Sequence, residues 1–172
     1  TQVNTAARKT ARIMISYSRK DDVFVKKLYN GLVGSGFAPE DIWVDWEGID
    51  ISEDWMAKIT KGIQEANAFV FVISPDSVAS KVCMEEIKLA EESNKRFIPI
   101  LYREVGKGVE LHQKLSSHNW AKIHDEKQLE EQLPNLVRAI NTDLDWLERH
   151  TQLFNKAKEW DNKGRTEFSL LR

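Results

Sequence analysis

Carboxylates that follow predicted strands are the side chains of this sequence best placed to do chemistry. Asp45 comes after one short apolar run, and Glu85 and Glu86 lie on a predicted helix that follows another. Adjacent residues of a helix point about 100° apart, so at most one of the two glutamates can face a cleft. Cys83 and Ile87 mark the buried side of that helix. This spacing places Glu86 at the border of the buried face, and Glu85 toward solvent.

Other common kinds of chemical site are not indicated. No Gly-x-Gly-x-x-Gly follows a strand, and the Gly106-Lys107 pair lacks both the upstream glycine and the following Ser or Thr of a phosphate-binding loop. The single cysteine, Cys83, excludes an internal disulfide and a cysteine-rich zinc site. The histidines lie far from Cys83 and show no i, i+4 pairing; they are His112, His118, His124 and His150. We therefore predict no metal site and no tightly held cofactor.

Short apolar segments alternate with helical patterns along most of the chain. Residues 69–73 are apolar on both faces, which is typical of a central strand of a parallel sheet covered by helices. Pro99 indicates an irregular or edge position for the strand that contains it. The predicted strands are residues 12–16, 42–44, 69–73, 97–101 and 119–123, whereas residues 102–117 predict a loop. Apolar residues at helical spacing follow four of the strands: Phe24, Leu28 and Leu32; Trp55, Ile59 and Ile63; Cys83, Ile87 and Ala90; Leu129, Leu133 and Leu136.

The alternation predicts an α/β fold with a five-stranded, parallel, doubly wound (flavodoxin-like) sheet flanked by helices. In such sheets the ligand binds past the carboxyl ends of the strands, where Asp45 lies. Residues 1–10 form a polar lead, residues 11–142 the domain, and residues 143–172 a helical extension. The extension carries Leu144, Leu147, Phe154 and Trp160 at helical spacing and then a tail without a clear period.

Composition limits the partners. The net charge is −2 and the pI about 6.1, so no overall positive field attracts nucleic acid or anionic lipid. The longest apolar runs fall far short of the about 20 residues that span a bilayer. The polar N-terminus does not resemble a secretory signal, and one cysteine suits a reducing compartment. We expect a cytoplasmic protein without nucleic-acid or membrane partners.

Several segments in register resemble the sequence boxes of Toll/interleukin receptor (TIR) domains. Residues 13–21, Ile-Met-Ile-Ser-Tyr-Ser-Arg-Lys-Asp, resemble the first box, and residues 43–51 resemble the second box with its BB loop. Asn119-Trp120 resembles the short third box. Residues 74–87, which contain Ser74-Pro75-Asp76-Ser77, Ser80 and Cys83-Met84-Glu85-Glu86-Ile87, resemble the Ser…Cys-x-x-Glu segment of bacterial NAD-cleaving TIR domains. The match covers about residues 11 to 140 and is far more specific than any one motif.

The resemblance implies an NAD⁺ nucleosidase that cleaves the nicotinamide–ribose bond, with Glu86 as the catalytic carboxylate. NAD⁺ would be a substrate and not a cofactor, in keeping with the missing coenzyme motif. The substrate-binding residues implied are Tyr17, Arg19, Trp43, Asp45, Trp46, Trp55, Ser74 and Cys83. The BB loop residues Gly48, Ile49, Asp50 and Ile51 would mediate self-association with other TIR domains. The extension resembles the connector to a fused sensor domain in bacterial immune or antiphage proteins.

A non-enzymatic TIR adaptor is the main alternative. Many active members carry a tryptophan four residues before the glutamate, where this chain has Val82. Val82 therefore favours the adaptor, and Glu86 in register favours the enzyme. Trp43 or Trp46 could supply the missing ring. A phospho-receiver domain is a remote alternative, because it needs an acidic pair after the first strand, where residues 16–18 are Ser-Tyr-Ser.

Overall fold

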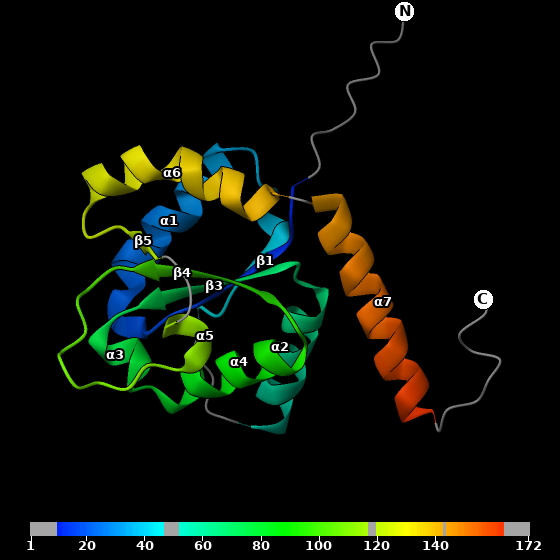
Figure 1. Ribbon diagram of the computed structural model, residues 1–172. Helices are drawn as coiled ribbons and strands as arrows, with labels where there is room; N and C mark the ends of the chain where they lie inside the picture. Colours follow the sequence, from blue (N-terminus) through cyan, green and yellow to red (C-terminus); the bar gives the residue numbers. More distant parts are fainter. Residues whose placement is uncertain (1–9, 47–51, 117–119, 143, 164–172) are drawn as a thin grey trace, which may run out of the picture.

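A five-stranded, all-parallel sheet forms the centre of the molecule (Figure 1). The computed structural model describes residues 10–46, 52–116, 120–142 and 144–163. The strand order is β2-β1-β3-β4-β5, which is the flavodoxin-like order, so the predicted fold class is confirmed. The strands are β1 (Ile13–Ser16), β2 (Ile42–Val44), β3 (Ala68–Ile73), β4 (Arg96–Leu101) and β5 (Ala121–Lys122).

Helices cover both faces of the sheet (Figure 1). One face carries α1 (Asp22–Gly34) and α6 (Glu126–Asn141), and the other carries α2 (Glu53–Glu65), α4 (Lys81–Glu92) and the short α5 (Gln113–Ser116). Single turns of helix, at Arg19–Asp21, Pro39–Asp41 and α3 (Pro75–Val78), lie in the connections. The loop predicted for residues 102–117 is wrong where α5 forms, because Leu115 is fully buried there against the second face.

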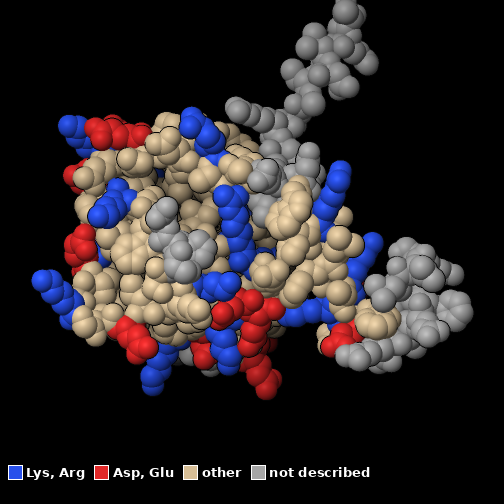
Figure 2. All heavy atoms as spheres, viewed as in Figure 1, with Lys and Arg blue, Asp and Glu red and all other residues tan. Residues whose placement is uncertain are grey.

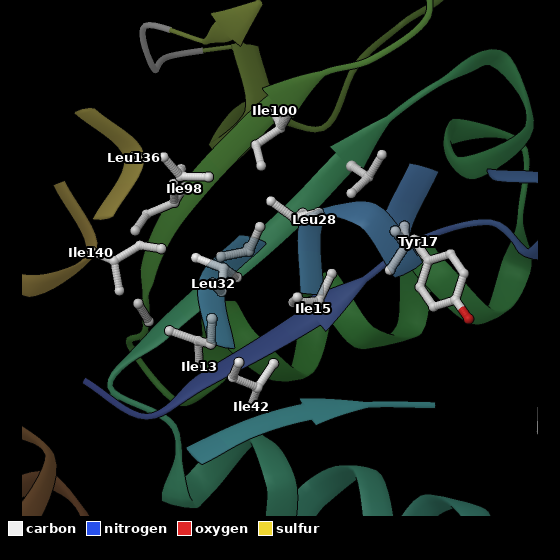
Figure 3. Close-up of a cluster of buried hydrophobic side chains, with 14 of the residues drawn as sticks. Ile13, Ile15, Tyr17, Leu28, Leu32, Ile42, Ile98, Ile100, Leu136 and Ile140 are labelled. Carbon is white, nitrogen blue, oxygen red and sulfur yellow. The ribbon is translucent and has the colours of Figure 1, made fainter. Parts of the chain in front are cut away.

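Alternating side chains of each strand supply two separate cores. Ile13 and Ile15 of β1 point to the face covered by α1 and α6, together with Ile98 and Ile100 of β4 (Figure 3). Met14 points to the opposite face, where aromatic residues of β3 and β4 pack against α2 and α4. Because both faces are buried, β3 and the first three residues of β1 read as continuous apolar runs in the sequence.

Side-chain caps fix where the helices begin near the carboxyl edge of the sheet. The Ser52 hydroxyl accepts a hydrogen bond from the Trp55 N–H at 3.2 Å, as its position before an acidic first turn predicts. The Ser80 hydroxyl accepts from the Cys83 N–H at 3.3 Å and starts α4. The α4 cap places Cys83 and Glu86 in the first two turns of that helix, next to the ends of β1 and β3.

Strand β4 lies inside the sheet, so the edge position that Pro99 suggested is wrong. Pro99 lies opposite Phe71 of β3, and pairing with β5 is confined to Ile100 and Leu101 in the part of the chain that the structure describes. A proline lacks the N–H that a ladder needs. It is accommodated here because its position precedes the two residues that pair with β5.

Helix α7 (Leu144–Asn162) runs beside the domain and contacts α2 (Figure 1). Asn155 donates to the Gln64 carbonyl at 3.3 Å, and the Asn94 amide nitrogen lies 2.8 Å from His150 Nε2. Trp146 and Leu153 are exposed on this helix. No helix among the described residues is both long and apolar enough to cross a membrane. Acidic and basic side chains are interspersed on the face shown in Figure 2.

Candidate functional site

A cleft of about 290 Å³ opens at the carboxyl ends of β1 and β2. The connection after β1 leads to α1 on one face of the sheet, whereas the connection after β3 leads to α4 on the other. A crevice forms where neighbouring connections diverge in this way, and doubly wound proteins bind ligands there. The cleft is lined by Ile15, Tyr17, Ser18, Arg19, Lys20, Asp45, Ser80, Val82, Cys83 and Glu86.

Glu86 lies at the base of this cleft and is only 4% exposed. Its Oε2 accepts a short hydrogen bond from the Ser16 hydroxyl at the end of β1. Burial raises the pKa of Glu86 from an ordinary 4.5 to about 8; the Ser16 hydrogen bond opposes the rise, and the charge of Asp45 adds to it. Glu86 is thus more deeply buried than the border position that helix periodicity predicts.

No cation neutralises this carboxyl among the described residues, since neither Lys nor Arg contributes to its shifted pKa. Arg19 lines the same cleft, and none of the described residues forms an ion pair with its guanidinium group. Lys20 differs, because its Nζ lies 3.0 Å from Asp76. The cleft therefore offers a buried carboxyl at its base and an available guanidinium group in its wall.

Tyr17 and Cys83 frame the carboxyl through contacts with the backbone. The Tyr17 hydroxyl donates to the Asp45 carbonyl at 3.2 Å, and the Cys83 thiol donates to the Tyr17 carbonyl at 3.3 Å. Burial is the main cause that raises the pKa of both Tyr17 and Cys83 to about 12. Both groups stay neutral near pH 7, so Cys83 is a poor nucleophile and serves to hold the cleft together.

A second hollow of about 300 Å³ adjoins the cleft and shares Asp45 with it. Trp43, Trp46 and Trp55 line this hollow, with Lys58 on its edge. Trp46 is 40% exposed and packs edge-on against Tyr17, with ring centroids 6.1 Å apart. Trp55 is buried in the core, and its indole N–H has no hydrogen-bond partner within the described residues. The three tryptophans therefore lie beside the glutamate cleft and not in it.

Ser74 lies outside both hollows in a buried polar cluster. Its hydroxyl donates to Asp21 Oδ2 at 2.5 Å, and it accepts the Ser77 N–H that caps α3. Arg103, just after β4, donates to Asp21 Oδ1 at 2.8 Å through Nε and contacts Asp76 at 2.5 Å. Sequence reasoning did not single out Arg103. The signal that could have revealed the pair is the position of the two residues, since Asp21 follows one strand and Arg103 follows another.

The BB loop residues Gly48, Ile49, Asp50 and Ile51 lie outside the described residues, as does Asn119 of the third box. Within the described ranges, no group of three or more His, Cys, Asp or Glu residues could hold a metal ion.

A family model described as the TIR domain matches residues 13–137, which is most of the chain. The chain belongs to the TIR domain family. The matched segment contains every described wall of the cleft and ends before α7, so the helical extension lies outside the TIR match.

Solved structures give a similar result for the fold. The TIR domain of the Toll-related receptor TRR-2 from Hydra magnipapillata is 22% identical, with a TM-score of 0.60, covering 76% of this chain and 98% of that one. A prokaryotic SEFIR domain is 17% identical, with a TM-score of 0.53, covering 76% of this chain and 92% of that one. At these identities the similarity supports the fold alone. A comparison with curated proteins finds no significant match.

Proposed function

We propose that this TIR domain is an NAD⁺ nucleosidase that uses Glu86 to cleave the bond between nicotinamide and ribose. The observation that carries the proposal is a carboxyl that is 4% exposed, lies in an open cleft and has no cation to neutralise it among the described residues. An unneutralised buried charge is costly to keep. Such a group is expected where a ligand or a transition state supplies the positive charge.

The proposed reaction needs one carboxylate. The C1′–N bond breaks, nicotinamide leaves as a neutral molecule with the bonding electron pair, and water adds to C1′ and loses a proton. Ordinary glycosidases need a second carboxyl to protonate an alkoxide leaving group. Here no general acid is required. Ionised Glu86 would hold the ribose hydroxyls and stabilise the oxocarbenium-like transition state electrostatically.

The rest of the substrate can be matched to the walls of the two hollows. Arg19 suits a phosphate group, because a guanidinium group binds phosphate oxygens through paired hydrogen bonds. Trp46 is exposed next to Asp45, where the hollows meet, and suits a flat ring. We therefore expect a dinucleotide to extend from Glu86 along Arg19 and toward Trp46.

Glu86→Gln is the direct test, with Glu85→Gln as the matched control on the neighbouring position of α4. Concentrated protein is incubated with NAD⁺, and nicotinamide is measured by chromatography. We expect Glu86→Gln to lower the rate on the order of 100-fold or more, since it removes the electrostatic stabilisation. Glu85→Gln should retain near wild-type turnover. Equal losses in both variants, or full turnover in folded Glu86→Gln, would reject the assignment.

We further propose that self-association activates the domain within an immune or defence pathway, where a fused sensor domain would respond to a trigger. The BB loop, residues 48–51, would contact a neighbouring protomer and complete the substrate pocket. Clustering would then act by raising the local concentration of TIR domains. Specific activity should climb with protein concentration, and substitutions in residues 48–51 should abolish the climb. A substantial activity that stays constant from dilute to concentrated protein would contradict this mode of activation.

A second candidate function is suggested by one residue in the cleft. Val82 lines the wall beside Glu86, where an aromatic ring would stack on a flat substrate. The domain could therefore serve as an adaptor that binds other TIR domains without turnover. The chromatographic assay separates the two functions: an adaptor releases no nicotinamide at any protein concentration, and it still associates with itself in sedimentation measurements.

A further inference from the structure

Ser16 is the one polar side chain of β1, which is otherwise apolar. It is 1% exposed, and its Cα lies opposite Phe71 of β3 in the sheet. A buried hydroxyl that makes no hydrogen bond destabilises the fold. The hydrogen bond that the Ser16 hydroxyl makes therefore indicates the role of this residue. Glu86 is the partner that the structure gives the Ser16 hydroxyl. The serine at this strand end is therefore matched to a residue 70 positions away in the sequence.

The hydrogen bond from Ser16 involves only one of the two carboxyl oxygens of Glu86. Oε2 accepts from Ser16, whereas Oε1 makes no hydrogen bond to any described residue. Glu86 also lines the cleft. One oxygen is thus fixed to the sheet and the other is left for a ligand. A fixed carboxyl loses less conformational entropy when it engages a hydroxyl than a freely rotating one does.

Helix α4 alone does not provide this orientation. Cys83, one turn before Glu86, donates its thiol hydrogen to the Tyr17 carbonyl, and in the described part of the chain it makes no hydrogen bond to the Glu86 carboxyl. Tyr17 uses its hydroxyl on the Asp45 carbonyl. Both neighbouring side chains are therefore engaged with the backbone, and Ser16 is left as the donor to Glu86.

We propose that Ser16 is a positioning residue for Glu86. The Ser16 hydroxyl orients the Glu86 carboxyl and favours the ionised carboxylate that the reaction needs. The inference rests on the proposed NAD⁺ cleavage. A hydrogen bond donated to a carboxylate favours the ionised form, and this contact opposes the effect of burial on Glu86. The other charged or titratable groups that line the cleft are Tyr17, Arg19, Lys20, Asp45 and Cys83, and Asp45 favours the neutral form of Glu86.

Ser16→Ala tests the proposal, and Ser93→Ala is the matched control. Ser93 is also a buried serine and lies at the opposite end of α4, away from the cleft. Turnover of NAD⁺ is measured from pH 6 to pH 9.5. Removing a hydrogen bond to a charged group should move the acid limb of kcat/KM upward by on the order of one pH unit. On that acid limb the variant should be about tenfold slower. The loss should shrink toward the alkaline plateau, and Ser16→Thr, which keeps the hydroxyl, should restore the wild-type profile.

A titration that does not depend on turnover separates this inference from the proposed function. The carboxyl carbon of Glu86 is followed by ¹³C NMR in protein labelled at glutamate, with Glu86→Gln used for assignment. We expect the Glu86 titration midpoint to rise in Ser16→Ala and to stay at the wild-type value in Ser93→Ala. An unchanged midpoint in folded Ser16→Ala would overturn the role of Ser16 alone. Wild-type protein that releases no nicotinamide would overturn the proposed function, whichever way the midpoint moves. A loss of rate that is the same at every pH would show a merely structural role and overturn the inference.

Discussion

Glu86→Gln should make the domain more stable at neutral pH, even though it should remove activity. Burial raises the pKa of Glu86 in the folded state to about 8, against an ordinary 4.5. Below pH 4.5 the carboxyl is neutral in both the folded and the unfolded chain, so it imposes no ionisation penalty. Between these pKa values the folded protein holds one proton more than the unfolded chain, so the free energy of unfolding falls as pH rises. Above pH 8 the full penalty is present.

The size of the effect follows from the two pKa values. Each pH unit between them costs about 1.4 kcal/mol of stability. At pH 7, roughly 2.5 pH units above the ordinary value, the penalty is about 3 kcal/mol, and above pH 8 it approaches about 5 kcal/mol. Glutamine has no charge to lose, and its amide oxygen can still accept the Ser16 hydrogen bond. The variant should therefore gain most of this free energy.

Urea unfolding at pH 5, 6, 7 and 8 measures the prediction. The difference in unfolding free energy between Glu86→Gln and wild type should be small at pH 5 and should widen at each step. Glu85→Gln, one residue away and less buried, should stay within about 0.5 kcal/mol of wild type at every pH. The reasoning about burial is refuted if Glu86→Gln is no more stable than wild type at pH 7, or if the difference does not grow with pH.

Four further changes to the protein, three substitutions and one chemical modification, test other parts of the site. Trp46→Ala should raise the KM for NAD⁺ by about fivefold or more and should lower the urea midpoint less than Trp43→Ala, whose ring packs next to Gly62 of α2; unchanged KM in folded Trp46→Ala would exclude its contact with substrate. Arg103→Met should destabilise the fold by about 3 kcal/mol, because buried Asp21 loses its cation; a loss under about 1 kcal/mol in urea unfolding would contradict this account. The Cys83 thiol should resist iodoacetamide at pH 8 until urea unfolds the chain, and rapid labelling of native protein, followed by mass spectrometry, would show that it is not buried.

The parts of the fold that depend on local pattern were predictable from the sequence. All residues of β3, and the first three residues of β1, are apolar because helices cover both faces of the sheet, and such a run can be recognised from the local sequence alone. Ser52 was recognisable as a cap because an N-cap is defined by its neighbours. Local reasoning about helix faces places Glu86 only at the border of the buried face, whereas the side chain is 4% exposed.

The contacts that give the site its chemistry join residues far apart in the sequence. Ser16 and Glu86 are 70 positions apart, and Asp21 and Arg103 are 82 apart. No sequence periodicity links the two residues of such a pair, because the order of the strands in the sheet decides which residues come together. The tryptophans show the same limit. Trp46 and Trp55 are equally plausible substrate contacts in the sequence, but one lies exposed and the other is buried in the core. Burial of that kind is decided by packing and not by residue type.

Two buried carboxylates, Asp21 and Glu86, lie near the same edge of the sheet but differ in whether a cation neutralises their charge. Asp21 is neutralised by Arg103 and receives a second hydrogen bond from Ser74, so its charge is satisfied within the fold. Glu86 receives one hydroxyl and, among the described residues, no cation. If both carboxylates served only the fold, a neutral side chain of the same size at position 86 would give a more stable domain. A carboxyl that destabilises the empty domain at neutral pH, in a cleft open to ligands, is instead suited to a positive charge that arrives with a ligand and develops further in the transition state.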